Sequence, residues 1–561
     1  MLSHPLPLLL LFTALSTFLI QSGELGTADT MHRVQVSHSF WTGQPQVFPN
    51  EYPEFGVHGR GGALYAWYGI GQSLLMLPAD LAGSAASYLP PWRNYVSSEA
   101  DPTIRNIVIS FSINILISVL TAFVAFRFLG MLGFSIGESI AGTLGLLCAT
   151  THLHYAQNMT ENNYIFLLTL AGIALQYQWL IGKNRHGLLL GSAALGLNLL
   201  TRITTIFDIF AAACFLFLVA FITRHARTGA KMRLTPAQNN PAMAGELSYP
   251  LTIFAYLRTA LPVYVVFLFI DRAYQYIRFG SWTNTYMTVL GREQRLLDPT
   301  LPASFPFNGH WFQGGLSSGI LGPLFSPEKS LFLFDPMFLL VLLLIALLWK
   351  RLAPAMQAFF VATLILLAVY IGFYANYIGW SGDFAWGDRY ISSAGELSTL
   401  LTLPLLLRYR QTLGRLICSF AFVVTAGSVI VQCASLAFWV PLEIYQMQDF
   451  GHHTCVVLLR FKNIAAFALH SRSIWGLNTP AMFQDPWDAV HITAWNFLPS
   501  LLRHVGMAPL WTVHVLYGVW IVVALALAFI TAKLFRIICH SAAKDAHYSM
   551  NRKPLSECPP H

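Results

Sequence analysis

The chain has 561 residues, of which 55% are hydrophobic and only 10% are charged. Soluble domains carry about 25% charged residues, because their surface has to be wetted. The composition therefore excludes an ordinary soluble protein and indicates that lipid is the solvent of most of the chain. The net charge of +8 does not indicate nucleic-acid binding, because its clearest basic clusters are short and adjoin apolar segments.

Twelve apolar segments are candidates for membrane-spanning helices, each of which needs about 20 residues to cross a bilayer. They are Leu6–Ile20, Ile107–Phe128, Ile136–Thr150, Tyr164–Ile181, Leu188–Leu200, Thr204–Ile222, Leu251–Ile270, Leu331–Leu348, Ala355–Tyr374, Leu397–Leu407, Leu416–Phe438 and Trp511–Ala532. The sequence predicts an all-α polytopic membrane protein with about twelve transmembrane helices. The first segment is either a signal peptide or a retained anchor, and the lack of a basic stretch before it favours the anchor.

Basic residues between these segments predict the orientation. They lie at Lys183–Arg185, Arg224–Arg233, Lys350–Arg351, Arg408–Arg415 and Lys533–Lys553. Alternation from an inside N-terminus places all of them on one side, which the positive-inside rule makes cytoplasmic. The longer polar segments then lie outside, at 22–105, 151–163, 271–330, 375–396 and 438–510. We expect the chemistry on the face where the polar residues gather.

Two acidic residues stand close to predicted membrane spans on the outside. Asp29 follows the first span by a few residues, and Glu161 stands at the start of the fourth. Acids held at the bilayer surface can meet a lipid-borne substrate while facing water. The alternative is a local role, in which Asp29 caps an amphipathic stretch Thr30–Trp41 and Glu161 caps a helix whose dipole favours an anion.

Other polar residues are open to two interpretations. Arg60 lies in the glycine-rich stretch Gly56–Gly62, which is either an anion-binding loop or a flexible turn. Arg202 interrupts apolar sequence, and either faces a polar partner or reaches the membrane surface. His152 and His154 have a spacing that metal ligands use, but no third ligand is evident, so no metal is predicted.

The segment Tyr377–Tyr390 is the richest candidate for ligand binding. It combines aromatic rings that could stack on sugars with glycines, acids and an arginine; the candidates are Trp380, Asp383, Trp386, Asp388, Arg389 and Tyr390. An aromatic belt at the membrane interface would explain the tryptophans but not the density of glycine, aspartate and arginine.

At these residues the chain resembles the polytopic glycosyltransferases of the GT-C superfamily, near the protein mannosyltransferases and aminoarabinose transferases. The stretches that carry the resemblance are the Asp29 loop leading into Tyr65–Pro78; Leu200–Arg202, similar to an "LTRP" motif with Ile203 replacing proline; Tyr276–Ser281 with Gly322–Pro327 and Leu333–Pro336; and Trp380–Tyr390, similar to "GWSWGPRY" with Asp388 where proline is usual. Together they organise roughly residues 1–410. We therefore take 1–437 as a GT-C-like transmembrane catalytic region, 438–510 as an outside segment of unknown role, and 511–561 as a last transmembrane helix with a basic cytoplasmic tail.

The resemblance implies an inverting transferase that takes a sugar from a polyprenyl-phosphate donor on the outer side of a bacterial inner membrane. Asp29 matches the general base, which takes the proton of the acceptor hydroxyl, and Glu161 matches an acid that orients the acceptor. Thr30 stands where the family usually has a second acid. The remaining candidates are Arg60, Arg278 and Arg389 for the donor phosphate, and Trp380, Asp383, Trp386, Asp388, Tyr390 and His154 for the acceptor or sugar.

The implied partners are the lipid-linked donor, a glycan, lipid or protein acceptor, and membrane lipid, with no nucleic acid, cofactor or metal. Three other functions stay open. A transporter or flippase would explain the spans, but no inverted repeat or pair of broken helices is evident. A polysaccharide polymerase or ligase would use a lipid-linked oligosaccharide. A non-catalytic binder of lipid-linked glycans would fit the missing second acid.

Overall fold

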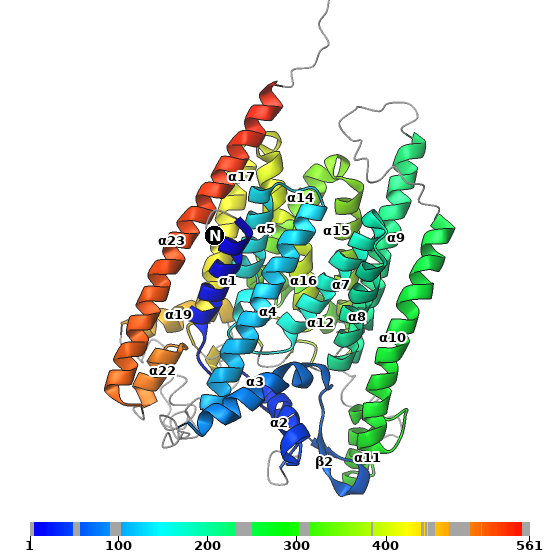
Figure 1. Ribbon diagram of the computed structural model, residues 1–561, viewed down its shortest axis with the longest axis vertical. Helices are drawn as coiled ribbons and strands as arrows, with labels where there is room; N and C mark the ends of the chain where they lie inside the picture. The colour runs from blue at the N-terminus through cyan, green and yellow to red at the C-terminus, as the bar shows by residue number, and fades with distance from the viewer. Residues whose placement is uncertain are drawn as a thin grey trace, which may run out of the picture.

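A computed structural model describes most of the chain as α-helix (Figure 1). The described residues are 5–48, 56–89, 103–229, 249–301, 315–377, 379–382, 385–438, 442–443, 446, 455–469, 494–505 and 508–551. The helices of the bundle are α1 (Pro5–Ile20), α4 (Ile104–Met131), α5 (Ile136–Ala149), α7 (Asn162–Gly182), α8 (Arg185–Thr201), α9 (Ile206–Gly229), α10 (Tyr249–Phe279), α14 (Met337–Leu348), α15 (Pro354–Tyr374), α16 (Ser392–Thr399), α17 (Thr402–Ser435) and α23 (Leu510–Asn551).

The bundle has the composition of a membrane protein. Seven helical segments of the described residues are long and apolar enough to span a bilayer; they correspond to α4, α7, α9, α10, α15, α16 with α17, and α23. Shorter helices occupy other predicted spans, including α1 with 16 residues and α5 with 14. The all-α polytopic class is therefore confirmed. The predicted number of about twelve spans exceeds the seven for two reasons. Several apolar segments form helices of fewer than 18 residues, and α16 with α17, which covers two predicted spans, is counted once.

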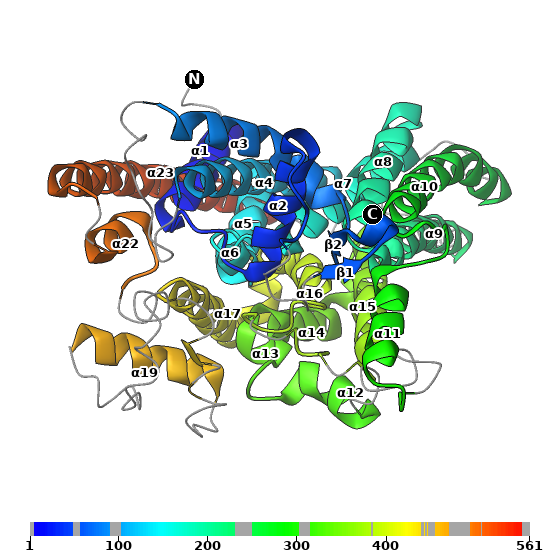
Figure 2. The same cartoon turned by 90° about the horizontal axis from the view of Figure 1, so that it is seen from below.

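Apolar side chains on the surface of the edge helices show which solvent the bundle requires. Helices α10 and α23 stand at opposite edges (Figures 1 and 2). Phe254 and Phe269 of α10 are 64% and 62% exposed, and Val522 and Leu525 of α23 are 66% and 68% exposed. Continuous apolar surface of this extent is stable in lipid and not in water.

Helix α17 contains two legs that the sequence predicted as separate spans. Gly414 has a non-helical backbone (φ 76°, ψ 170°). Before it, Pro404 lies against Gly142 in the first half of α5, and after it, Ser428 donates a hydrogen bond to the carbonyl of Ala149 at the end of α5 (2.7 Å). The chain therefore reverses at Gly414, as its left-handed φ permits.

The ends of the bundle differ in character. One end, which we call the loop end, carries α2 (Ala28–Thr42), α3 (Gly71–Ser87) and α11 (Tyr286–Leu297), seen at the bottom of Figure 1. At the other end short basic connectors meet. There Arg408 donates to the carbonyl of Gly133 (2.7 Å) and pairs with Glu138 (2.6 Å), and the Tyr409 hydroxyl donates to the carbonyl of Arg351 (2.9 Å).

Short elements complete the loop end. They are β1 (Gly56–His58) paired antiparallel with β2 (Leu64–Ala66), the 3-10 turns η2 (Arg60–Gly62) and η3 (Ile203–Thr205), and helices α6 (His152–Tyr155), α12 (Leu316–Phe325), α13 (Leu331–Phe334), α19 (Val456–Ala468) and α22 (Leu498–Val505). A further 3-10 turn, η8 (Trp349–Arg351), joins α14 to α15 at the basic end.

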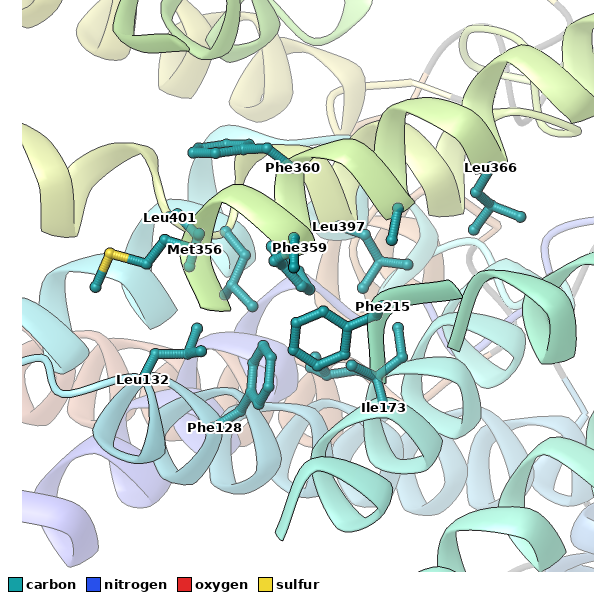
Figure 3. Packing of buried hydrophobic residues seen from close by; sticks show 14 of the residues in the cluster. Phe128, Leu132, Ile173, Phe215, Met356, Phe359, Phe360, Leu366, Leu397 and Leu401 are labelled. Carbon is teal, nitrogen blue, oxygen red and sulfur yellow. The ribbon is translucent and has the colours of Figure 1, made fainter. Parts of the chain in front are cut away.

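An aromatic core fixes the helices whose loop ends carry polar residues. Phe128 of α4, Phe215 of α9 and Phe359 of α15 contact one another, with ring centroids 5.3 to 6.1 Å apart (Figure 3). Lipid is as apolar as these side chains, so the hydrophobic effect does not drive the helices together. Close packing of side chains therefore has to hold them. Each aromatic pair adds about 0.5–1.5 kcal/mol beyond the area it buries.

Candidate active site

Asp29 lies at the centre of a polar cluster at the loop end. Its Oδ2 pairs with Nη1 of Arg389 at 2.7 Å, and its Oδ1 accepts a hydrogen bond from the Tyr68 hydroxyl at 2.8 Å. Arg389 is 360 residues further along the chain. Both members of the pair are partly open, since the side chains of Asp29 and Arg389 are 20% and 15% exposed.

A second carboxylate, Glu161, lies beside this pair and is held from both sides. Its Oε2 is 2.9 Å from Nη2 of Arg33, and its Oε1 pairs with Arg202. Only 4% of the Glu161 side chain is exposed. Arg33 stands one helical turn after Asp29 on α2, and its guanidinium lies 4.3 Å from the ring centroid of Tyr68. The two carboxylates and three arginines therefore form one network.

Close backbone contacts bring these segments together. A Cβ at Gly26 would lie 2.8 Å from Cα of Asn158, so the Asp29 loop packs directly on the loop before α7. Thr30, which follows Asp29, donates to the carbonyl of Met159 and is fully buried. Thr30 thus joins the two loops and carries no charge to the site.

Glycines also bring Tyr68 onto the end of α8. A Cβ at Gly69 would lie 2.3 Å from the carbonyl oxygen of Leu200, and one at Gly71 would lie 2.3 Å from Oγ1 of Thr201. Only glycine allows this approach. It places Tyr68 close to Arg202, so two of the sequence stretches that carry the family resemblance meet at the cluster.

The segment that holds Arg389 is anchored by its backbone. Nδ2 of Asn162, the first residue of α7, donates to the carbonyl of Arg389 at 2.7 Å. The Tyr390 ring stacks on Tyr374 with centroids 4.2 Å apart, and the Arg202 guanidinium lies 5.2 Å from the centroid of Tyr390. These contacts give the cluster an aromatic side formed by α15 and the Arg389 segment.

The cluster carries more positive than negative charge. Three guanidinium groups face two carboxylates, which leaves one positive charge in excess. Burial raises the pKa of Asp29, but the charges of Arg389 and Arg33 outweigh it, so the pKa lies below its ordinary value. Burial acts in the same way on Glu161, where Arg33 and Arg202 lower the pKa well below its usual range. Both acids are therefore ionised at neutral pH.

Two buried N–H groups of the cluster have no acceptor among the residues that the structure describes. They are Nη1 of Arg33 and Nε of Arg389. Unpaired buried donors are costly, because desolvation is not offset by a hydrogen bond. Donors in this position are suited to the oxygens of an anionic ligand.

Neither acid makes the capping hydrogen bond that its position near a helix N-terminus allows. The N-cap of α2 is Thr27, whose side chain accepts from the Thr30 amide, and Asp29 lies within the first turn. Glu161 stands at the N-cap of α7, but its side chain makes no capping hydrogen bond there. Arg202 is paired with Glu161 and does not simply reach toward the membrane surface.

Arg278 supports the cluster from behind. Its side chain is 1% exposed, and its Nη1 donates to the carbonyls of Ala66 (2.5 Å) and Tyr68 (3.3 Å). Its Nη2 donates to Gln275 at 2.8 Å. As placed, Arg278 holds the backbone of the Tyr68 segment and does not face the Asp29–Arg389 pair. Arg60 is not brought to the cluster and lines a separate pocket.

Trp386 and His154 are buried beside the cluster. Trp386 is 1% exposed and packs edge-on against Phe334 with centroids 4.9 Å apart, and His154 stacks on it at 5.9 Å. Burial and the charge of Arg460 hold the pKa of His154 well below its ordinary value, so this ring is neutral. Both residues support the segment that carries Arg389.

Asp388 turns the backbone before Tyr390. Its Oδ1 accepts from the Tyr390 amide at 2.9 Å, and burial raises its pKa to about 7. Trp380 packs on α12, where a Cβ at Gly322 would lie 2.1 Å from its ring. Asp383 lies outside the described residues. No group of three or more His, Cys, Asp or Glu side chains that could hold a metal occurs in the described part of the chain.

Arg33, Tyr68 and Arg202 are cluster residues absent from the sequence-based set of candidates. Arg202 carried a signal, namely a charge in apolar sequence. Arg33 carried a weaker one, because it lies one helical turn from Asp29. Nothing local distinguished Tyr68 from the neighbouring aromatic residues.

No protein-family model and no curated protein matches this chain. Among solved structures, the oligosaccharyltransferase of Archaeoglobus fulgidus in its apo form is similar, with 12% identity, a TM-score of 0.40, and coverage of 79% of this chain and 58% of that one. ArnT from Cupriavidus metallidurans bound to undecaprenyl phosphate is similar with 13% identity, a TM-score of 0.40, and coverage of 84% and 73%. Our chain thus spans little more than half the length of the oligosaccharyltransferase.

Proposed function

We propose that this protein is a membrane glycosyltransferase that moves a sugar from a polyprenyl-phosphate donor to an acceptor hydroxyl. The observation that carries the proposal is the pairing of Asp29 with Arg389 at 2.7 Å, next to Glu161 and two further arginines. A carboxylate that can accept a proton and guanidinium groups that can hold a phosphate lie side by side at one end of an apolar bundle. That combination fits a reaction whose leaving group is a lipid phosphate.

The donor phosphate would bind where the cluster has its excess positive charge. Nε of Arg389 and Nη1 of Arg33 supply donors without an acceptor among the described residues. A guanidinium matches a phosphate through two parallel hydrogen bonds. A phosphate would therefore compete with Asp29 for Arg389, and its arrival would release one carboxylate oxygen for proton transfer.

In the proposed reaction Asp29 accepts the proton of the acceptor hydroxyl. The acceptor oxygen forms a bond to the anomeric carbon as the bond from that carbon to the phosphate oxygen breaks. The electron pair of the broken bond leaves with the polyprenyl phosphate, whose new negative charge the arginines stabilise. A single displacement from the opposite face inverts the anomeric centre. General-base assistance of this kind contributes about 10²- to 10⁴-fold to the rate.

The two acids take different parts. Asp29 is one-fifth exposed and has a partner that a phosphate can remove, so it is assigned as the base. Both oxygens of Glu161 are held by arginines, so Glu161 positions Arg33 and Arg202. Tyr390 borders the cluster and is assigned to the sugar or acceptor. We place the loop end on the outer side of a bacterial inner membrane, because the basic connectors lie at the opposite end.

The test uses purified full-length protein in detergent and a panel of radiolabelled polyprenyl-phosphate sugars. Release of label from one donor is compared between the wild type, Asp29→Asn and Asp298→Asn, an exposed acid near the end of α11 that serves as the control. We expect turnover by the wild type and the control, and a loss of about 10²-fold or more in Asp29→Asn. Undiminished turnover in Asp29→Asn would contradict the assigned base. Binding without turnover of any donor would favour a binder or transporter.

A further inference from the structure

A polar pocket lies at the loop end, apart from the Asp29 cluster. It has a volume of about 350 Å³ and is lined by residues of the β1–β2 hairpin, the end of α10 and α11. The polar lining includes Arg60, Arg292, His58 and Asn284, and the rings of Tyr276 and Phe279 form its apolar part. The pocket is larger than a simple anion needs, and it has room for a sugar.

Contacts between distant segments build the pocket. A Cβ at Gly59 would lie 2.3 Å from the carbonyl oxygen of Arg278, so the hairpin turn packs directly on the end of α10. On the other side, Glu293 of α11 accepts a hydrogen bond from the His58 amide at 2.6 Å and lies 3.3 Å from its Nδ1. The hairpin is thus fixed between two helices.

The charge of the pocket is positive. Glu293 is engaged by His58, whereas Arg60 and Arg292 form no ion pair with any carboxylate of the described residues. Two guanidinium groups can hold an anion from two sides, and an amide such as Asn284 can bind hydroxyl groups. Aromatic rings beside them suit the apolar face of a sugar.

The pocket is mechanically linked to the Asp29 cluster. Strand β2 leads from the pocket to Tyr68, whose hydroxyl binds Asp29. Arg278 contacts both regions, since its carbonyl lies against Gly59 and its side chain binds the carbonyl of Tyr68. A molecule held in the pocket is therefore anchored next to the segment that orients the base.

We propose that this pocket is a binding site for a phosphate-bearing sugar, with Arg60 and Arg292 holding the phosphate. The assignment of this sugar to the acceptor rests on the proposed transferase function. The assignment of the pocket as an anion-binding site does not depend on that function. Arg60 then serves a ligand other than the donor phosphate that the sequence suggested.

The test measures equilibrium binding of radiolabelled N-acetylglucosamine 1-phosphate to the full-length protein in nanodiscs, with neutral N-acetylglucosamine as competitor. We expect Arg60→Ala and Arg292→Ala each to weaken binding roughly 10- to 100-fold, as loss of a charged hydrogen bond does. Arg295→Ala is the matched control, because it removes the same charge from α11 but does not line the pocket. Arg60→Lys and Arg292→Lys test whether charge alone suffices.

Unchanged binding in the Arg60→Ala, Arg292→Ala double variant, or equal competition by the neutral sugar, would overturn the proposal. A lipid-anchored sugar phosphate in the same nanodisc that displaces the free probe would identify a membrane glycolipid as the source. Failure to displace it would identify a soluble sugar phosphate. Arginine-dependent binding by a protein that turns over no donor would refute the transferase and leave the pocket standing.

Discussion

Two arginine–carboxylate pairs at the loop end use their hydrogen-bonding groups in different ways. In the first, Arg460 of α19 donates from Nε and Nη2 to the two oxygens of Glu443, each at 2.6 Å, and neither side chain is exposed. Its Nη1 donates to the carbonyls of Ser435 and Phe438, both at 2.9 Å. This pair is sealed, and it joins α19 to the end of α17.

In the second pair, Arg389 makes one contact with Asp29, and both side chains are partly exposed. Nε of Arg389 has no acceptor among the described residues. In the sealed pair, protein groups accept hydrogen bonds from Nε, Nη1 and Nη2 of Arg460. In the open pair, Nε of Arg389 is left to bind a ligand. The comparison indicates that openness and incomplete pairing, more than the presence of an ion pair, distinguish a site of chemistry from a structural contact.

The largest expected effect is the loss of stability in Arg460→Ala. Removing one member of a buried pair leaves the other charge uncompensated, so we expect the free energy of unfolding to fall by about 3–5 kcal/mol. Thermal unfolding in detergent measures it. The double variant Arg460→Met, Glu443→Leu should recover much of the loss, because no charge is then stranded. A loss below about 1 kcal/mol in Arg460→Ala would show that the pair is not sealed.

A smaller stability effect, dependent on pH, is expected from Glu161. Its pKa is lowered in the folded protein, because Arg33 and Arg202 outweigh the effect of burial. A lowered pKa means that the stabilisation is present above the unfolded-state pKa and is lost as the pH falls through the folded-state pKa. Glu161→Gln should therefore be less stable at neutral pH and lose less stability on acidification. The measurement is the unfolding temperature of the wild type and Glu161→Gln across the acid range, with the exposed Glu328→Gln as control. The same pH dependence in Glu161→Gln as in the wild type would contradict the pairing.

Arg389→Ala should affect donor binding more than stability. Asp29 remains partly solvated in this variant, whereas the donor phosphate loses a charged hydrogen bond worth about 1.5–3 kcal/mol. We expect a roughly 10- to 100-fold weaker affinity for a polyprenyl-phosphate sugar, measured by equilibrium binding in nanodiscs. Arg389→Lys keeps the charge but loses the planar fork, so an intermediate affinity is expected. Wild-type affinity in Arg389→Ala would remove this residue from the phosphate site.

The smallest effect is expected from Tyr68→Phe, which removes one hydrogen bond from Asp29. That bond helps to lower the pKa of Asp29, together with Arg389 and Arg33. Its loss should raise the pKa of Asp29. Because the base must be ionised, the decline in transfer rate at acid pH should begin at a higher pH than in the wild type. A pH profile that moves toward lower pH would contradict the role of this contact.

Much of the fold was predictable, because long apolar segments are a local property of the sequence. Asp29, Glu161 and Arg389 were predictable as candidates, since each stands in a polar segment near a predicted span. Their pairing was not, because Asp29 and Arg389 are 360 residues apart. Contacts between distant parts of the chain bring these segments together, among them Gly26 against Asn158 and the hydrogen bond from Asn162 to the carbonyl of Arg389.

The richest segment of the sequence also shows the limit of such prediction. Trp386 looked like a platform for a sugar, but it is buried against Phe334 and supports the segment that carries Arg389. Residue type does not reveal which way a loop side chain points. Arg33 was missed for the opposite reason, because an arginine on an amphipathic helix resembles an ordinary surface charge.

The central claim is that the open pair performs the chemistry, and the single-turnover transfer rate of Asp29→Asn at saturating donor tests it most directly. The account predicts a rate about 10²- to 10⁴-fold below that of the wild type, with donor affinity and unfolding temperature retained. A wild-type rate in Asp29→Asn would contradict the account, and the pair would then be structural like Arg460 and Glu443.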